Sequence, residues 1–364
     1  MKPYIPEKLP PASLDYRGLI GLVGEASAAL ARYDGLLQGM VNPEILLSPL
    51  TTKEAVLSSK IEGTQVTIDE VLQHEAGMAA ESQRKQQDIG EIVNYRSALL
   101  QAEKELKNKP LSLFLIRQMH KALLSGVRGA QKKPGTFRKS QNWIGTPGAP
   151  IDQADYVPPE PHLVQAYMDD LEKYVQSDKD DVLLHSAVMH AQFEIIHPFL
   201  DGNGRIGRLL IPLFLFSKRR LTRPMFYISE YLENNRDEYY VRLGEISASK
   251  DWNGWLEFYL RAVRYQGKKN AARVLRILEL YQQMRTWIRE LAHTRYASEI
   301  ADALFDKPIF RASDVVKRTN IPKQTIMPVL KHLLDAKIIV KIRVASGRRP
   351  AVMKFPELLA ITEG

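Results

Sequence analysis

Apolar side chains recur at spacings of three and four residues along most of the chain, which is the pattern of helices that bury one face. Residues 181–196 and 209–216 are apolar on nearly every side, which predicts two buried helices, the second with an expected kink at Pro212. Between residues 126 and 161 glycine and proline interrupt this pattern. Residues 137–145 have the length of a strand, so we predict a short β-hairpin flap on a mainly α-helical protein.

The pattern changes again near the carboxyl end of the chain. Residues 298–305, 311–319 and 321–337 predict three short helices. Apolar and polar residues then alternate over 337–344 and 350–355, which predicts a two-stranded wing. Three helices followed by a wing are typical of a winged helix-turn-helix.

Local signals predict where some helices begin. Ser298 and Ser313 stand where we expect the N-caps of the first two of these short helices. Thr67, followed three residues later by Glu70, predicts a capping box for another helix. Pro328 suits the first turn of a helix better than its interior, which leaves the start of the third short helix open.

Composition narrows the class of protein. The chain has 364 residues, which predicts two or three domains, and 45% hydrophobic with 26% charged residues is ordinary for a globular protein. It has no cysteine, which excludes disulfides, a thiolate nucleophile and cysteine metal ligands. Its longest apolar run is too short to span a bilayer, and the amino terminus lacks the apolar core of a signal peptide, so we expect a cytoplasmic protein.

The net charge of +9 is concentrated at one end of the chain. Residues 266–364 hold 19 Lys and Arg against 9 Asp and Glu, whereas the preceding part is close to neutral. Such asymmetry indicates a separate basic module. This module either contacts nucleic acid or is a solvated basic face, and the sequence leaves both interpretations open.

The candidate chemistry lies in the twelve residues that follow the first buried helix. A Gly-Asn-Gly run at 202–204 can adopt left-handed backbone and direct successive N–H groups at one point, which makes an anion-binding nest. Arg205 and Arg208 are three apart and therefore share a helix face, and guanidinium groups bind phosphate oxygens in pairs. Asp201 is an oxygen ligand of the kind that Mg²⁺ takes together with substrate phosphates. His197 can act as a base near neutral pH.

Each of these features alone is most often structural, as a packed loop histidine, a simple turn or solvated arginines. Their joint presence favours a site for phosphoryl-group transfer. The stretch also matches the signature HPFx(D/E)GNGRxxR position for position, and in this it resembles the Fic domain family. The resemblance extends over about residues 111–264, and residues 135–145 are similar to the flap of that family.

The resemblance implies a protein adenylyltransferase, which transfers AMP from ATP to a Ser, Thr or Tyr hydroxyl of a target protein or of itself and releases pyrophosphate. It implies that His197 is the general base and that Asp201 holds Mg²⁺ as the cofactor. Arg205 would contact the inner phosphates and Arg208 the γ-phosphate. The implied ATP-binding and phosphate-binding residues are Gly202, Asn203, Gly204, Arg205, Ile206, Gly207, Arg208 and Tyr240.

Tyr240 is the candidate for the adenine contact, and a core tyrosine on an amphipathic helix is the alternative. Some relatives carry an asparagine seven residues after this tyrosine. The chain has Ser247 at that position, so one expected adenine or ribose contact is not matched.

A second signal lies near the amino terminus. Residues 51–62 predict a helix that is ended by Gly63, with Ser58 and Glu62 four apart on one face. Ser58 to Gly63 fits the inhibitory pattern (S/T)xxxE(G/N) of the Fic family. The resemblance implies that Glu62 pairs with Arg208 and occupies the γ-phosphate position. A glutamate at an exposed helix end is the alternative.

The resemblance divides the chain into an N-terminal helical region (1–110), a catalytic domain (111–265) and a linker helix with the winged helix (266–364). Two other functions stay open. One is a transcription regulator that binds DNA and only senses a nucleotide, and the other is a Fic enzyme that removes AMP or transfers another phosphate-bearing group. His197 separates the first of these from an enzyme, because a sensor needs no base.

The winged helix has two open roles, as a DNA contact or as a protein-docking surface such as a homodimer interface. In the first case the third short helix is the recognition helix, and basic residues lie on it and on the wing. The DNA-contact candidates are Lys323, Gln324, Thr325, Lys341, Arg343, Arg348 and Arg349.

Overall fold

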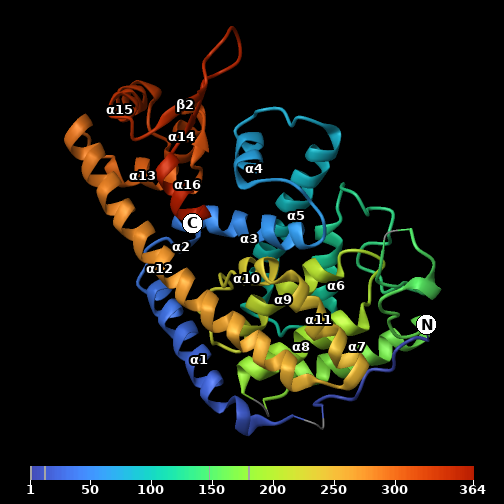
Figure 1. Ribbon diagram of the computed structural model, residues 1–364. Helices are drawn as coiled ribbons and strands as arrows, with labels where there is room; N and C mark the ends of the chain where they lie inside the picture. The colour runs from blue at the N-terminus through green and yellow to red at the C-terminus, as the bar shows by residue number, and fades with distance from the viewer. Residues whose placement is uncertain (1, 12–13, 147, 179–180) are drawn as a thin grey trace.

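The computed structural model describes residues 2–11, 14–146, 148–178 and 181–364. Helices dominate it, which confirms the predicted mainly α class (Figure 1). At its centre lie α8 (Val182–Ile196) and α9 (Asn203–Ser217), the two helices that the apolar pattern predicted to be buried. Over the residues described, every helix is too short or too polar to cross a bilayer.

The other elements surround this pair or flank it. Before it lie α1 (Tyr16–Gln38), α2 (Pro43–Leu46), α3 (Ser48–Ile61), α4 (Ile68–Glu75), α5 (Gln83–Leu106), α6 (Leu113–Leu123), the 3-10 turns η1 (Ile151–Gln153) and η2 (Pro161–Leu163), and α7 (Val164–Gln176). After it lie α10 (Ser229–Asn234), α11 (Arg236–Ser249), α12 (Trp252–Ala292), α13 (Ala297–Asp306), β1 (Ile309–Phe310), α14 (Ala312–Thr319), α15 (Lys323–Asp335), β2 (Val340–Arg343), β3 (Val352–Lys354) and α16 (Pro356–Glu363).

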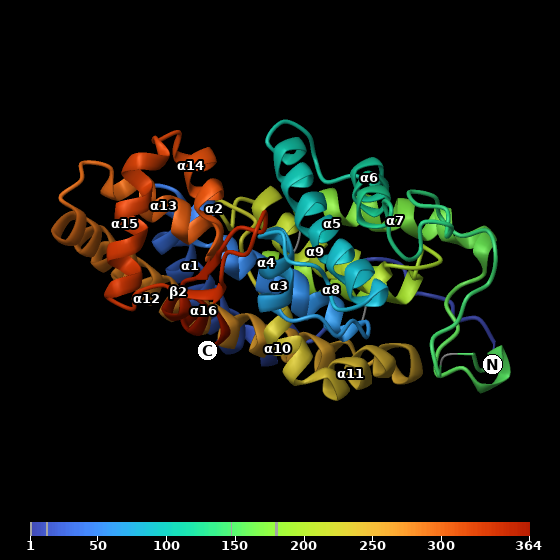
Figure 2. The ribbon, with the colours of Figure 1, turned by 90° about the horizontal axis from the view of Figure 1, so that it is seen from above.

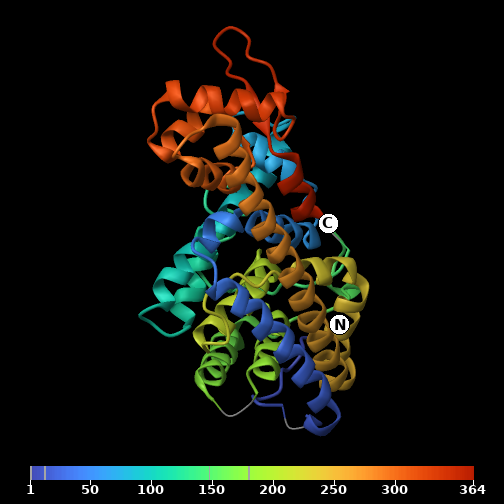
Figure 3. The same cartoon turned by 90° about the vertical axis from the view of Figure 1, so that its left-hand side faces the viewer.

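The long helix α12 joins the central helices to the C-terminal region (Figures 1 and 3). Helix α1 packs along it, and a Cβ at Gly267 of α12 would lie only 3.1 Å from Ala29 of α1. A glycine at this point therefore lets the two helices approach closely. The expected domain boundary at residue 265 falls inside α12, so this helix belongs to both neighbouring parts.

The C-terminal elements follow in the order expected for a winged helix-turn-helix. The strands pair antiparallel in the order β1-β3-β2, with Lys354 of β3 opposite both Ile309 and Val340. The two predicted wing strands are β2 and β3, whereas the sequence pattern missed β1. A strand of two residues is too short to produce a readable alternation.

The two expected N-caps in this region were wrong. Helices α13 and α14 begin after Tyr296 and Arg311, so Ser298 and Ser313 lie within their first turns. At α14 the capping role is taken by a salt bridge, because the Arg311 guanidinium and amide both bond Asp314. A side-chain pair of this kind carries no simple one-residue signature.

Other expectations about helix ends can be compared directly with the structure. The capping box is confirmed, because the Thr67 amide donates to Glu70 Oε2 at 2.8 Å and the Glu70 amide donates to Thr67 Oγ1 at 3.2 Å. Helix α15 begins at Lys323, so Pro328 lies in its interior. Pro212 likewise lies inside α9.

The predicted hairpin flap is a loop that is held by a single bridge. Among the described residues of 126–161, Ile144 and Tyr156 form one antiparallel bridge, and no strand develops. The loop is also bonded to its surroundings, since the Arg138 amide donates to the Pro198 carbonyl at 2.8 Å. Strand-like length in the sequence therefore did not produce a strand.

Helix α3 lies between the central helices and the C-terminal region (Figures 1 and 2). A buried charged cluster anchors it there. Lys53 Nζ donates to Glu230 Oε1 of α10 and to the carbonyls of Thr362 and Glu363 at the end of α16, each at 2.9 Å. Arg273 of α12 makes two further bonds to Glu230. The position of α3 therefore depends on both the central helices and the C-terminal region.

Candidate functional site

The loop between α8 and α9 turns sharply because two of its residues are left-handed. His197 ends α8 with φ 48°, and Gly202 precedes α9 with φ 79°. Asn203 fixes the loop between them, since its Oδ1 accepts from the Phe199 amide and its Nδ2 donates to the Phe199 carbonyl, both at 2.8 Å. The Asn203 side chain, which we expected among the phosphate contacts, therefore shapes the backbone of the predicted nest.

His197 has one ring nitrogen fixed and the other free to accept a proton. Its Nδ1 lies 3.3 Å from the Glu194 carbonyl. A carbonyl only accepts, so Nδ1 carries the proton and Nε2 keeps the lone pair. Burial lowers the pKa of His197 to about 4, although the neighbouring Glu62 carboxylate opposes this. The imidazole is therefore neutral at pH 7 and can act as a base at Nε2.

This environment predicts the titration of His197. Because burial disfavours the imidazolium, the His197 pKa should lie well below its usual value of about 6.5, and the base should stay competent as the pH falls from 8 towards about 5. NMR titration of the full chain measures this pKa, with the resonance assigned by its loss in His197→Asn. A fitted pKa close to 6.5 would mean that the ring is solvated, contrary to this account.

Arg138 holds the His197 turn from the side of the flap. Arg138 is 2% exposed, its Nε donates to the His197 carbonyl at 2.9 Å, and its NH2 donates to the carbonyl of Pro159 at 2.6 Å. The carbonyls of the left-handed His197 and of Pro159 are thus bound to one buried cation. The sequence had placed Arg138 in the flap without assigning it this task.

His120 of α6 connects the flap to the motif loop. The Gly135 amide donates to its Nδ1, and its Nε2 donates to the Asp201 carbonyl, both at 2.8 Å. Its ring stacks on Phe199 with centroids 3.7 Å apart. Burial lowers the pKa of His120 to about 4, so the ring is neutral, as one donated and one accepted bond require. No local motif indicated this residue.

Arg205 is already paired with two carboxylates. Its NH1 lies 2.6 Å from Glu91 Oε2 of α5 and its NH2 lies 3.2 Å from Asp201 Oδ1. The sequence predicted a contact with the inner phosphates of a nucleotide. In the structure Arg205 is 4% exposed, and its guanidinium positions the Asp201 carboxylate. Glu91 was missed because it lies more than a hundred residues away in the sequence.

Asp201 fits a magnesium ion that is held mainly by a substrate. Its side chain is 35% exposed, and a Cβ at Gly129 would lie 2.8 Å from its Oδ2, so that glycine leaves space beside the oxygen. The residues described contain no group of three or more His, Asp or Glu side chains suited to a metal. A single partly exposed carboxylate matches Mg²⁺, which often takes one or two carboxylates and completes its shell with water and phosphates.

Arg208 is the point where α3 meets α9. It is 1% exposed, its Nε donates to Ser58 Oγ at 2.9 Å, and its NH2 donates to the Ser58 carbonyl and to Glu62 Oε1, both at 2.7 Å. Burial by itself would raise the pKa of Glu62, but the Arg208 charge outweighs it and lowers that pKa. The three residues that the sequence had paired lie in direct contact, and the carboxylate is ionised.

Glu62 lies over the first turn of α9. Helix α3 ends at Ile61, and Gly63 follows with φ 96°, close to the predicted end. A Cβ at Gly204 would collide with the Glu62 carboxylate and lie 2.9 Å from Arg208 NH1. The amides of a first helical turn lack helical partners and attract anions. The Glu62 carboxylate therefore stands where an anionic ligand of α9 would bind.

Ile206 and Gly207 are enclosed by protein. Ile206 is 0% exposed and belongs to the core. The Gly207 carbonyl accepts from His190 Nδ1 at 3.0 Å, and His190 Nε2 accepts from the Tyr239 hydroxyl at 2.9 Å. Burial lowers the pKa of His190 to about 3, so this ring is neutral too. These two positions of the motif therefore pack α9 against the core and against His190 of α8.

Tyr240 of α11 presents a partly exposed ring near the Glu62–Arg208 pair. It is 41% exposed, and the Arg236 guanidinium lies 5.5 Å from the ring centroid. Burial and the Glu62 charge raise its pKa. A core tyrosine would be buried, so this exposure does not fit the alternative of a core tyrosine. At Ser247, the position of the unmatched contact, the hydroxyl donates within its own helix to the Gly244 carbonyl at 2.8 Å.

Two family profiles match adjacent parts of the chain. The Fic/DOC family N-terminal profile matches residues 20–104 and the Fic/DOC family profile matches residues 110–215, together just over half of the chain. The chain is 31% identical over 179 residues to a probable protein adenylyltransferase of Aquifex aeolicus, covering 47% of this chain and 50% of that protein. It is 34% identical over 113 residues to a protein adenylyltransferase Fic of Aedes aegypti, covering 30% and 20%. The chain thus spans half or less of the length of these curated relatives.

Solved structures are similar over a larger part of the chain. A Fic family protein from Desulfovibrio desulfuricans G20 covers 95% of this chain and 98% of its own, with a TM-score of 0.63 and 19% identity. A Fic domain containing signaling protein from Bacteroides thetaiotaomicron covers 70% and 97%, with a TM-score of 0.56 and 19% identity. At such identities these similarities show the fold.

Proposed function

Because the chain belongs to the Fic/DOC family, we propose that it transfers AMP from ATP to a Ser, Thr or Tyr hydroxyl of a target protein or of itself, with release of pyrophosphate. The observation that carries this proposal is a neutral His197 with a free Nε2, beside a helix N-terminus and a buried Arg208. The curated relatives named as adenylyltransferases support the class of reaction.

The reaction uses the site as follows. Nε2 of His197 takes the hydroxyl proton while the hydroxyl oxygen attacks the α-phosphorus of ATP, and the bond from that phosphorus to the bridging oxygen breaks as pyrophosphate leaves. The free amides of the first turn of α9 and its positive dipole end favour the phosphate charge. Arg208 binds the γ-phosphate once Glu62 has left it.

Mg²⁺ is the cofactor of this proposal, with Asp201 as its protein ligand. When bound, Mg²⁺ neutralises negative charge on the phosphates. Arg205, held by Glu91, keeps the Asp201 carboxylate in place for this purpose. Phosphate contacts from Gly202 to Gly204 and an adenine contact from Tyr240 belong to the same proposal.

We expect Asp201→Ala, or removal of Mg²⁺ with EDTA, to lower AMP transfer by about 100-fold or more, because the phosphate charge is then left unneutralised. Initial rates of AMP incorporation measure this. Asp178→Ala is the matched control, since that aspartate is exposed. Among the residues that the structure describes, it forms an ion pair only with Lys218. Transfer that survives both treatments would remove Asp201 from the mechanism.

We further propose that Glu62 keeps the enzyme in a low-activity state. Its Oε1 lies 2.7 Å from Arg208 NH2 and so takes the place of a phosphate oxygen at that guanidinium. The negative charge of the carboxylate also repels a triphosphate that approaches the first turn of α9. A bound ATP would then lie displaced, with its α-phosphorus out of line for attack. Ser58 contributes two more bonds to Arg208 and so holds the guanidinium still.

Removal of AMP from a modified protein is a second candidate function, which one observation favours. Glu62 is ionised and 35% exposed inside the same site, so its carboxylate can orient a water molecule. Intact-protein mass spectrometry, after incubation with Mg²⁺ and a mixture of the four nucleoside triphosphates, separates these chemistries. A gain of one AMP supports the first proposal. A gain of a phosphate or another nucleotide would replace it, and loss of AMP from a modified chain would favour removal.

A further inference from the structure

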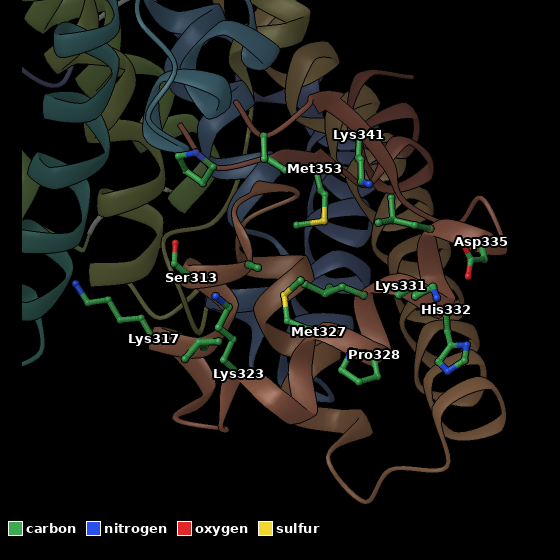
Figure 4. A pocket seen from close by; sticks show the side chains of 17 residues that line it. Ser313, Lys317, Lys323, Met327, Pro328, Lys331, His332, Asp335, Lys341 and Met353 are labelled. Atoms are coloured by element: carbon green, nitrogen blue, oxygen red, sulfur yellow. The ribbon is translucent and has the colours of Figure 1, made fainter. Parts of the chain in front are cut away.

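Basic side chains of the C-terminal region gather around one groove. The groove lies between α14, α15 and the strands β2 and β3, with a volume of about 1160 Å³ (Figure 4). Lys317 and Lys323 lie on one side of it, and Lys331 and Lys341 lie on the other. Asp335 is the one acidic side chain among the lining residues that the structure describes. The groove therefore has a positive rim around a lining that is mainly apolar.

The exposed face of α15 combines hydrogen-bond donors with an apolar group. Lys323, Gln324 and Lys331 are exposed along it, and Met327 between them is 44% exposed. Figure 4 shows Met327 and Met353 pointing toward each other across the groove. This is the helix that takes the place of the recognition helix in a winged helix-turn-helix.

The wing continues the basic face. The loop between β2 and β3 projects from the rest of the molecule (Figures 1 and 3). Arg348 and Arg349 are exposed at its turn, which two bonds between Ser346 and Arg349 close at 2.9 and 3.0 Å. Arg343 stiffens the base of the loop by donating to the Pro350 carbonyl.

We propose that this face binds double-stranded DNA, with the start of α15 in the major groove and the turn of the wing on the neighbouring minor groove. The cations are spread along a helix and a projecting loop instead of converging on one point. This matches a linear polyanion better than a single anionic group, because each phosphate of the backbone is met in turn. In this arrangement the sugar-phosphate backbone that separates the major from the minor groove of the DNA would pass over the protein groove between α14, α15 and the strands.

The side chains at the start of α15 suit base edges as well. The N-terminal residues of a recognition helix are those that reach the bases. Lysine donates to guanine, and glutamine bonds adenine with both ends of its one side-chain amide, the oxygen accepting from N6 and the nitrogen donating to N7. An apolar side chain such as Met327 suits the methyl group of thymine. Gln324 and Lys323 therefore carry sequence preference, whereas Lys317, Lys331, Lys341 and the wing arginines carry affinity. This proposal does not depend on AMP transfer.

Fluorescence anisotropy with the full chain and a labelled duplex of mixed sequence tests this. With about five phosphate contacts, the logarithm of affinity should fall with a slope of about −4.5 against the logarithm of salt, so binding weakens by about 500-fold between 50 and 200 mM salt. Lys331→Gln and Lys341→Gln should each reduce the slope by about 1. Lys173 is exposed on α7, which packs against α8 and not in the C-terminal region, and Lys173→Gln is the matched control.

Two results would overturn the DNA proposal. The first is an absence of binding at about 50 mM salt, where the electrostatic attraction is strongest. The second is binding of polyglutamate as tight as that of duplex DNA, with the same loss in Lys331→Gln and Lys341→Gln, because the face would then fit an acidic protein segment instead. A slope that falls in the two variants but not in Lys173→Gln supports the proposal.

Discussion

Replacing Glu62 by glycine should raise the rate of AMP transfer by about 10- to 100-fold. The carboxylate makes a charge-assisted bond to Arg208, and bonds of this kind contribute about 1.5–3 kcal/mol, which corresponds to that range of rates when they must break first. The two bonds from Ser58 remain in the variant. Arg208 should therefore stay in place with one donor released for the γ-phosphate.

Incorporation of labelled AMP into the protein itself measures this effect. Glu62→Gln keeps the size of the side chain and removes its charge, so it should fall between the wild type and Glu62→Gly. Glu81→Gly is a control, because that glutamate is 77% exposed and pairs with Lys85 at the start of α5, not with an arginine of the motif. If Glu62→Gly binds ATP normally and its rate does not change, the inhibitory role of Glu62 is wrong.

Removal of His197 should lower AMP transfer by about 100- to 10,000-fold, the usual contribution of a positioned base. His197→Asn is the sharper variant, because asparagine tolerates the left-handed backbone that alanine would strain. It has no lone pair comparable to Nε2 with which to take the hydroxyl proton. The comparison is best made in the Glu62→Gly background, where the starting rate is higher.

ATP affinity separates a chemical from a structural effect of this variant. In the proposed reaction the Nε2 lone pair faces the target hydroxyl and not the ATP, so His197→Asn should leave ATP binding close to its original value while the rate of transfer falls. A parallel loss of ATP binding would mean that the turn at residue 197 has collapsed. A rate that stays within a few-fold of the parent would exclude His197 as the base.

The sequence was most informative where neighbouring residues act together. Residues 197–208 are contiguous, and Ser58 and Glu62 share one helix face, so spacing indicated which side chains share a face or a loop. The continuous apolar runs likewise predicted α8 and α9, since a helix buried on all sides needs no tertiary information to be recognised. The pairing of Glu62 with Arg208 needed the family resemblance as well, because 146 residues separate them.

The sequence was least informative about the residues that hold the site in shape. His120, Arg138 and Glu91 each bond part of the motif loop or its arginine, yet each comes from a different segment. Their side chains act through long-range contacts, which leave no local pattern. For the same reason the sequence missed the pairing of Arg205 with Glu91. It also missed two contacts between residues four apart, from Arg205 to Asp201 and from Asn203 to Phe199, because the spacing of these residues does not show which way their side chains turn.

The flap shows the opposite failure, where a local signal was present and tertiary contacts overruled it. Residues 137–145 have strand-like length, but Arg138 and Asn142 bond the motif loop instead of a partner strand. A strand needs a partner along its length, and within the described part of the loop only Ile144 has one.

The most direct test of the account uses ATP labelled at the α-phosphorus in one experiment and at the γ-phosphorus in another, with Glu62→Gly and with Glu62→Gly combined with His197→Asn. The account predicts that Glu62→Gly incorporates the α label, that neither protein incorporates the γ label, and that the double variant incorporates neither. Incorporation of the γ label, or α labelling that persists without His197, would contradict it.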